Sequence, residues 1–346
     1  MAEPDHATLE PLKVRMDDVA LLARVSRATV SRVLVGHPPV SAATREKVFN
    51  AVRELGYVPN MMARGLATRS SDLVGLLLRD PRNPAYGLLH SQIQSAASAQ
   101  GLQLVTAVPH WAEAAEDELA ALRRLLGLRV GGLLVSTGVI KARDLEPFLE
   151  SVPVVSVGRV EDHPGIYGVS YDEDTNGAIL ADAVAAVGHR AVAVLVTGSA
   201  VSTAENRRGT SMAARLEGHG IQVVRVAADK FGTTDEGNED IVGLVQERRV
   251  TAAMFPNDAR AVAFLRHARA ASLDVPGDVS VTGCDGAGLG LDLLGLATLR
   301  IPVEAVASRA LEVLADLMRD RSAPVRHELY PGVFVPGSTL APPPPR

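Results

Sequence analysis

Small polar and basic side chains gather in one short segment near the start of the chain, and their chemistry suits the edges of DNA bases. An α-helix fits the major groove, where arginine donates paired hydrogen bonds to guanine and small side chains touch a thymine methyl group. Serine and threonine hydroxyls can reach bases or phosphates. A helix over this segment would offer such a groove the side chains of Ser26, Arg27, Ala28, Thr29, Ser31 and Arg32.

The segments around these residues predict three short helices that would hold them in place. One helix is expected over Met16–Ala23, and a second over Arg27–Leu34 with Ser26 as its N-cap. Ser41 is expected to cap a third. Two helices joined by a short turn, the second with an exposed polar face, form a helix-turn-helix. A three-helix bundle with a merely solvated basic face is the alternative.

The distribution of charge favours the nucleic-acid interpretation. Residues 12–70 contain ten Lys and Arg against four Asp and Glu, a net charge of +6. Residues 1–11 carry −3, and residues 71–346 carry −8 from 25 basic and 33 acidic side chains. A small basic segment beside a large acidic one indicates a polyanionic partner for the basic part alone.

Past residue 70 the pattern alternates short apolar runs with helical stretches, which is typical of parallel sheets covered by helices on both faces. We expect an all-α helix-turn-helix head and an α/β body of two doubly wound lobes, with hinges near Tyr167–Asp174 and Leu299–Pro302. The candidate strands are Leu73–Leu78, Leu102–Ala107, Gly132–Val135, Val152–Val157, Ala191–Val196, Gln222–Ala227, Ala252–Phe255 and Val279–Thr282.

Several classes of protein are excluded by composition and motif. A chain of 346 residues is too long for one ordinary domain, and no apolar run reaches the ~18 residues that a membrane span needs. The polar, acidic N-terminus predicts no secretory signal, so a cytoplasmic location is expected. Cys284, the only cysteine, cannot form an intramolecular disulfide.

No catalytic or metal-binding pattern stands out either. The nine histidines show no HExxH spacing, and the glycine-rich run GCDGAGLGLDLLG lacks the Lys-Ser/Thr of a phosphate-binding loop. There is no Ser-His-Asp order and no catalytic pair of carboxylates. We therefore expect no enzyme, no cofactor and no metal.

The run DVALLARVSRATVSRVLVGHPPVSAATREKVFNAVRELGYVPNMMARGLATRSSDLVGLLL resembles the head and hinge of the lactose-repressor (LacI/GalR) family of bacterial transcriptional regulators. The later blocks VSVGR, VAAVGHRAVAVL, PNDARAVAFLRHARAASLDVPGDVSVTGCD and FVPGST resemble that family's body, so the resemblance covers about residues 13–340. The expected parts are a disordered N-terminus (1–12), a helix-turn-helix domain (13–58), a hinge helix and linker (59–71) and a periplasmic-binding-protein-like body (72–340). The Pro-rich composition of the tail (341–346) predicts that it is disordered.

The short hinge helix expected over Met61–Ala67 is too short, and with Gly65 too weak, to be stable alone in water. In the resembled family, paired hinge helices lie in the minor groove and a leucine from each wedges into a base step. Leu66 stands at that position, with Asn60 and Arg64 as further expected DNA contacts. An ordinary linker contact with the body is the alternative role for Leu66.

The effector site is expected in the crevice between the lobes, at the carboxyl ends of the strands, where open α/β sheets bind ligands. Acid, arginine and amide side chains can share the hydroxyls of a sugar. Positions that match the family's ligand contacts are Tyr86, Arg208, Asn257 and Asp285, with Asp80 and Arg159 as further candidates. The alternatives are that Tyr86 is core, Arg208 lies on a solvated helix and Asp285 only caps the next segment.

The sequence also departs from the family pattern. Asp17 stands where the lactose repressor has tyrosine, Ser211 where a glycine is usual after the effector arginine, and Gly286 where a second acid is usual. No leucine-heptad tail follows the body, so a homodimer is expected.

These features together predict a ligand-responsive, sequence-specific regulator, most simply a repressor, that binds a pseudo-palindromic operator as a dimer. A sugar or related metabolite between the lobes would switch its affinity by favouring one body geometry. The alternative is a sugar-binding module, or a sugar-processing α/β protein, whose head binds nucleic acid without sequence preference.

Overall fold

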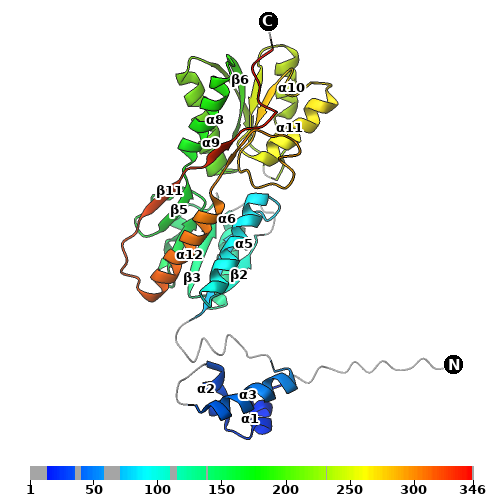
Figure 1. Cartoon of the computed structure of the whole chain (residues 1–346). Coiled ribbons are helices and arrows are strands. Elements are labelled where there is room, and N and C mark those ends of the chain that lie inside the picture. Colours follow the sequence, from blue (N-terminus) through cyan, green and yellow to red (C-terminus); the bar gives the residue numbers. More distant parts are fainter. Residues whose placement is uncertain are drawn as a thin grey trace, which may run out of the picture. The chain divides into compact units, whose positions relative to one another are not determined.

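The computed structural model describes residues 14–35, 40–57, 71–109, 115–137, 139–230 and 232–344. The chain divides into two compact units, Met1–Ser70 and Ser71–Arg346, which are called the head and the body below (Figure 1). The expected hinge helix Met61–Ala67, with its candidate DNA contacts Asn60, Arg64 and Leu66, lies outside the described residues.

The head contains the three predicted helices. They are α1 (Met16–Ala23), α2 (Arg27–Val35) and α3 (Ala42–Leu55). The turn between α1 and α2 is tight because Arg24 adopts the left-handed conformation, with φ 53°. The predicted caps are confirmed: Ser26 Oγ accepts from the backbone N–H of Thr29 at 3.1 Å, and Ser41 Oγ accepts from that of Thr44 at 3.3 Å.

A small apolar core joins the three helices, so α2 is fixed by packing rather than by its intrinsic propensity. The core takes one stripe from each helix and leaves the opposite faces to solvent. Its buried members are Val19, Ala20, Ala23, Val30, Val33, Val48, Ala51 and Tyr57.

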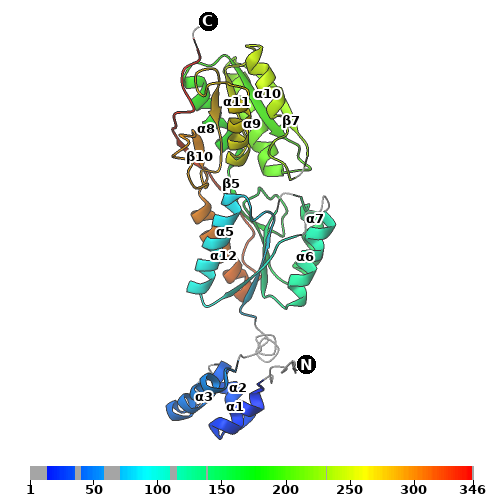
Figure 2. The same ribbon diagram turned by 90° about the vertical axis from the view of Figure 1, so that its right-hand side faces the viewer.

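The first sheet of the body has six parallel strands in the order β11-β5-β4-β3-β1-β2. They are β1 (Leu73–Leu78), β2 (Gln103–Ala107), β3 (Gly132–Ser136), β4 (Val154–Val157), β5 (Tyr167–Tyr171) and β11 (His327–Tyr330). On one face lie α5 (Pro84–Ala99) and α12 (Val303–Arg319), and on the other lie α6 (Ala115–Gly127) and α7 (Ala142–Leu149) (Figure 2).

The second sheet has four parallel strands in the order β7-β6-β8-β9. They are β6 (Ala191–Thr197), β7 (Gln222–Ala228), β8 (Ala252–Met254) and β9 (Ser280–Thr282). Helices α8 (Glu173–Ala186) and α9 (Thr203–Gly218) cover one face, and α10 (Asn238–Gln246) and α11 (Asp258–Ala270) cover the other. The predicted pair of doubly wound lobes is thus confirmed.

The chain crosses between the lobes three times. The first crossing follows β5, the second lies between β10 (Thr298–Arg300) and α12, and the third lies between β11 and β12 (Val333–Val335). The expected hinge Tyr167–Asp174 was wrong over its first half, because Tyr167–Tyr171 forms a fully buried strand of the first sheet. The third crossing was not expected.

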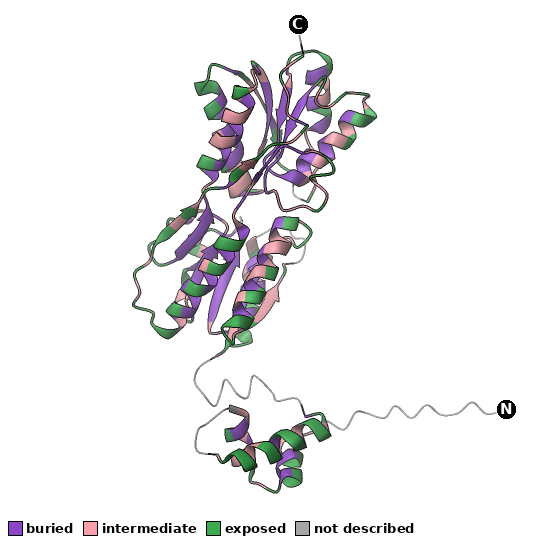
Figure 3. Ribbon diagram, in the orientation of Figure 1, coloured by how far each residue is buried: buried purple, intermediate pink, exposed green. Residues whose placement is uncertain are grey.

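Burial follows the layers of this fold. The strands of both sheets are mostly buried, and the helices bury one face each (Figure 3). One apolar cluster runs through both lobes, since it contains Leu76 of β1 and Val192 of β6. The residue that we expected to begin a loose tail, Ala341, is held at the end of the second lobe: its carbonyl accepts from Ser280 Oγ and lies 3.0 Å from His189 Nε2.

Candidate functional site

The outer face of α2 presents the side chains that we expected to contact DNA. Ser26, Arg27, Ala28 and Arg32 are exposed, whereas Thr29 and Ser31 are half-buried. Val30 and Val33 on the opposite face are buried in the head core. Helix α2 therefore has one side for packing and one side of small and basic groups free to enter a groove.

An acid on α1 lies beside this face. Asp17 Oδ1 is 3.8 Å from Arg27 Nε, and both side chains are largely exposed, at 64% and 69%. A solvated pair of this kind is worth ~0.2–1 kcal/mol, so DNA can compete for the arginine. The departure at residue 17 thus places a negative charge next to an expected base-reading side chain.

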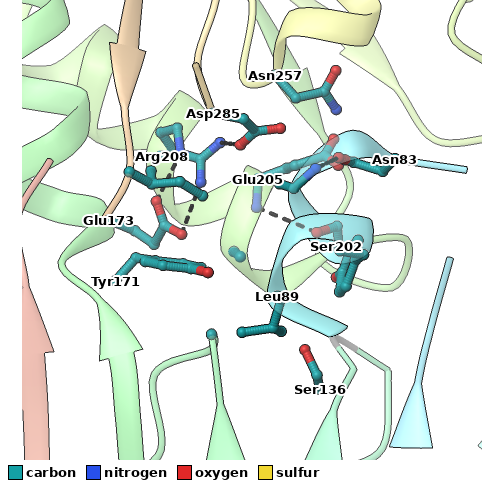
Figure 4. Close-up of a pocket in the computed structure, with 15 residues that line it drawn as sticks. Asn83, Leu89, Ser136, Tyr171, Glu173, Ser202, Glu205, Arg208, Asn257 and Asp285 are labelled. Atoms are coloured by element: carbon teal, nitrogen blue, oxygen red, sulfur yellow. Dashed lines mark hydrogen bonds and ion pairs between the residues drawn. The ribbon is translucent and has the colours of Figure 1, made fainter. Parts of the chain in front are cut away.

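In the body, the carboxyl ends of strands from both lobes meet around a small cavity of about 50 Å³. Side chains of the first lobe face side chains of the second across it (Figure 4). This first cavity is lined by Asn83, Ala85, Tyr86, Leu89, Ser136, Gly158, Tyr171, Glu173, Ser202, Ala204, Glu205, Arg208, Asn257, Asp285 and Ile301.

Arg208, on α9, is the centre of the polar side of this cavity. Its side chain is 4% exposed, so the prediction places it correctly in the crevice and the solvated-helix alternative is wrong. Nε and Nη2 donate to Glu173 at 2.7 and 2.9 Å, and Nη1 donates to Asp285 at 3.3 Å and to the carbonyl of Pro256 (Figure 4). Four of the five N–H donors are thereby used, which leaves one for a ligand.

Asp285 and Gly286 explain one departure from the family pattern. Asp285 has a φ of 113°, a conformation that non-glycine residues rarely adopt. At Gly286 a Cβ would lie 2.7 Å from the Cα of Arg300, so the acid usual in the family would clash there. Burial raises the pKa of Asp285 well above its usual range.

Asn257 and Tyr86 supply further polar groups from opposite sides. Asn257 caps α11, because its Oδ1 accepts from the backbone N–H of Arg260 at 2.8 Å, and its amide nitrogen is left to donate to a ligand. Tyr86 is half-buried on α5, and desolvation raises its pKa to about 12. Its hydroxyl is therefore neutral at physiological pH.

A second, wider cavity of about 310 Å³ adjoins the first and shares five lining residues with it. The shared residues are Asn83, Tyr86, Ser202, Glu205 and Asn257. Asp80 lines only the second cavity, where its carboxylate accepts from Arg82 Nε at 3.1 Å. The combined volume lies at the lower end of the ~300–1,000 Å³ of typical small-molecule sites.

The structure does not bring Arg159 into either cavity, so that prediction lacks support. Arg159 is 7% exposed, and its guanidinium contacts Ser156, Glu161 and the backbone carbonyls of Thr137 and Ile140. These contacts tie the loop after β4 to the first lobe. Arg159 follows a strand, as residues of the crevice do, but its side chain points into the first lobe.

Several residues that line the two cavities were not predicted, among them three charged ones. Glu173 opens α8 and is fully buried, Glu205 lies on the first turn of α9, and Arg260 lies on α11. Acids in the first turn of a helix are ordinarily explained by the helix dipole. The ion pair between Glu173 and Arg208 joins two different helices, so it is recognised only in the folded structure.

The search for other kinds of site gave negative results in the residues described. No group of three or more His, Cys, Asp or Glu side chains there could hold a metal ion. No helix in the same part of the chain combines the length and apolar character needed to cross a bilayer.

Comparison with known proteins identifies the family. Residues 15–60 match the model of bacterial regulatory proteins of the lacI family, residues 71–255 match that of periplasmic binding proteins and the sugar-binding domain of the LacI family, and residues 181–340 match a periplasmic binding protein-like domain.

Full-length relatives agree with these matches. The transcriptional regulator GalR of Escherichia coli K12 is 30% identical, with 89% of this chain and 90% of the relative covered. The transcriptional regulator MalR of Streptomyces coelicolor is also 30% identical, with 96% and 98% covered. The lac repressor dimer bound to operator and the anti-inducer ONPF is 25% identical with a TM-score of 0.82, over 95% of this chain and 99% of that one.

The helix-turn-helix head, the two-lobed body and these similarities lead to one assignment. The expected resemblance is confirmed over both units of the chain. The protein belongs to the LacI family of bacterial transcriptional regulators.

Proposed function

We propose that this protein binds a pseudo-palindromic operator as a homodimer and that a sugar or related metabolite between the lobes of its body changes its affinity for DNA. The observation that carries the proposal is the pairing of two features in one chain. The exposed face of α2 suits a DNA groove, and the crevice of the body collects Arg208, Asn257, Asp285 and Tyr86.

The proposed DNA contacts are the residues of α2 and its cap together with three residues of the segment before the body. Arg27 and Arg32 would read bases, and the small neighbours would allow close approach. The full proposed set is Ser26, Arg27, Ala28, Thr29, Ser31, Arg32, Asn60, Arg64 and Leu66. Because DNA is in the cytoplasm of bacteria, the protein would act there.

The proposed dimer is supported by an exposed apolar loop after β9. Leu289 and Leu293 are 102% and 89% exposed, and Leu294 is 48% exposed. Three leucines on one loop form the kind of patch that protein contacts cover. A second copy of the chain is the simplest partner, since a two-fold dimer would also present two heads to a palindrome.

A regulatory rather than catalytic role is supported by the hydrogen bonds that already engage two glutamates of the first cavity. Glu173 is fully paired with Arg208, and Glu205 accepts from the hydroxyl of Thr197 at 2.8 Å. Neither is left as a free base beside a nucleophile. We therefore propose that the crevice binds its ligand without chemical change.

The decisive experiment is a selection of bound duplexes from a random DNA pool with the purified full-length protein, with and without a mixture of sugars and sugar derivatives. Enrichment of a near-palindrome that disappears on Arg27→Ala supports the proposal. Equal binding of all duplexes, with the same salt dependence for selected and random DNA, would contradict it.

A further inference from the structure

The second cavity contains a buried cation that its own protein surroundings satisfy only in part. Arg260 is 4% exposed. Its Nε donates to Glu205 at 3.3 Å, but its Nη1 is buried and has no hydrogen-bond partner in the part of the chain that the structure describes. A charged donor left unpaired in a buried site is costly. Such a group is therefore expected where an acceptor arrives from outside the chain.

The charges around Arg260 favour an anion as that acceptor. Arginines 79, 82 and 260 and the acids Asp80 and Glu205 line the second cavity, for a formal charge of +1. Both acids are already engaged: Asp80 by Arg82 and Glu205 by the hydroxyl of Thr197 as well as by Arg260. One further negative charge would neutralise the cavity.

The first cavity has the opposite character. Glu173, Glu205 and Asp285 line it with a single arginine, Arg208, for a formal charge of −2, and the carbonyl of Pro256 accepts from one N–H group of Arg208. An anionic group would be repelled by these acids, whereas hydroxyls can exchange hydrogen bonds with them. The two adjoining cavities thus differ in the chemistry that each accepts.

We infer that the effector carries one anionic oxygen group, a phosphate or a carboxylate, which binds Arg260 in the second cavity while its hydroxyl-bearing part occupies the first. This inference rests on the proposed function, because it assumes that the crevice is the effector site. The shared residues Asn83 and Tyr86 make the two cavities neighbours, so one ligand of sugar size can reach both. The hydroxyls of Ser202, Thr233 and Thr234 line the second cavity and add donors for anionic oxygens.

The test compares ligands of matched shape on the full-length protein by titration calorimetry. The probes are neutral hexoses, the corresponding hexose 6-phosphates, the corresponding hexuronates and inorganic phosphate. We expect an anionic sugar to bind about tenfold to hundredfold more tightly than its neutral parent, because a charge-assisted hydrogen bond is gained. The comparison of hexose 6-phosphates with hexuronates shows which anionic group fits. Inorganic phosphate should compete with the anionic sugar that binds more tightly.

Arg260→Gln removes the proposed contact, and Arg266→Gln is its matched control. Arg266 lies on the same helix, is 70% exposed and pairs with Asp235 at 3.4 Å. We expect Arg260→Gln to abolish the preference for anionic sugars and Arg266→Gln to keep it. The comparison of ligands on the unsubstituted protein decides the inference even where Arg260→Gln does not fold.

The outcomes separate this inference from the proposed function. Release of operator by neutral sugars, with no preference for their anionic forms, would overturn the inference and leave the regulator intact. Tight binding of an anionic sugar that depends on Arg260 but leaves operator affinity unchanged would support the inference and contradict the proposed regulation. An equal preference for anions in Arg260→Gln and the unsubstituted protein would overturn the assignment of the contact to this arginine.

Discussion

Arg208 is half of a buried ion pair and is also a proposed ligand contact. Glu173 is fully buried against it, so Arg208→Ala would leave an uncompensated buried carboxylate. We expect this change to remove the effector response and also to lower the free energy of unfolding by ~3–5 kcal/mol. Urea unfolding of the full chain measures the loss of stability. Titration of a complex with DNA by the ligand measures the effector response.

The pair of substitutions Arg208→Met and Glu173→Leu separates these roles. Removing both charges leaves no unpaired ion, so most of the lost stability should return while the effector response stays absent. If the double variant were no more stable than Arg208→Ala, the ion pair would not be the source of the loss. A normal effector response in the double variant would contradict the ligand role.

Asp17 is expected to restrain Arg27 and to weaken DNA binding in general. Asp17→Asn removes one negative charge beside the proposed DNA contacts and releases the arginine from a 3.8 Å ion pair. We expect affinity for both specific and random duplexes to rise about twofold to threefold at low salt. Fluorescence anisotropy against salt concentration measures the change. Glu54→Gln, the same charge change on an exposed part of α3, is the control, and an equal gain there would refute a specific role for Asp17.

Sequence alone identified only some of the polar residues that line the crevice. Arg208, Asn257, Asp285 and Tyr86 were predicted because each matches a position at the carboxyl end of a strand or on the helix after it, and all four line the first cavity. Glu173 and Arg260 were missed. Their roles depend on contacts between helices that are far apart along the chain, and no local pattern encodes such contacts.

Among the elements of the body, β11 is held by a polar cluster rather than by an apolar stripe. Arg309 on α12 donates to both oxygens of Glu328 on β11, at 2.9 and 3.0 Å, and Tyr330 also donates to Glu328. The Arg309 guanidinium lowers the pKa of Glu328 to about 2. The cluster thus fastens the strand at the edge of the first sheet to a core helix.

This lowered pKa gives a pH dependence with a definite sign. Because the carboxylate is favoured in the folded state, its contribution is present above the ordinary glutamate pKa and is lost as the pH falls toward about 2. The pair is partly exposed, so we expect Glu328→Gln to cost only ~1 kcal/mol at pH 7. The difference from the unsubstituted protein should be constant between about pH 5 and 7 and should shrink below about pH 4.5.

Urea unfolding at several pH values checks this expectation. Asp316→Asn provides the control, since Asp316 forms an exposed pair with Arg319 on the same helix, with side chains 63% and 72% exposed. Its effect on stability should be smaller than that of Glu328→Gln at every pH. A Glu328→Gln difference that grew on acidification would show that the carboxylate is not stabilised by Arg309.

The elements that could be predicted are those whose own sequence shows a clear pattern of apolar residues. The eight expected strands are all present within one or two residues of their predicted ends, because each contains a short, mostly apolar run. Strand β5 was mistaken for a hinge, since its sequence YGVSY mixes polar and aromatic residues. Strand β11, HELY, mixes charged and apolar residues, and β12, VFV, is only three residues long, so neither has a long apolar run to reveal it.

For the whole molecule, the three crossings between lobes and the shared apolar cluster define how the body can respond to a ligand. Leu76 of the first lobe and Val192 of the second belong to one cluster, so the lobes are coupled by packing as well as by covalent links. A ligand that contacts both lobes shifts the balance between body geometries only by its difference in affinity for them. Sequence predicted two of the crossings, and the third is recognisable only once β11 is seen to pair with β5.

The quaternary prediction concerns the leucine loop after β9. Leu289 and Leu293 are almost fully exposed in the single chain, and burying both in a dimer would contribute ~3–6 kcal/mol. The double substitution Leu289→Asp and Leu293→Asp should therefore raise the dimer dissociation constant at least about a hundredfold. Sedimentation velocity over a range of protein concentrations measures this change directly.

Loss of the dimer should also weaken binding to a palindromic operator. In a dimer, the first head that binds holds the second head close to its half-site, and a monomer lacks this gain in affinity. We expect the double variant to bind a single half-site as before and a full palindrome no better than that half-site. Leu128→Asp, at a 37% exposed leucine outside the loop, should leave both the dimer and the palindrome preference unchanged. If the loop variant remained dimeric and retained its preference for the palindrome, the dimer contact would have to lie on another face of the body, and the exposed leucines would require a different partner.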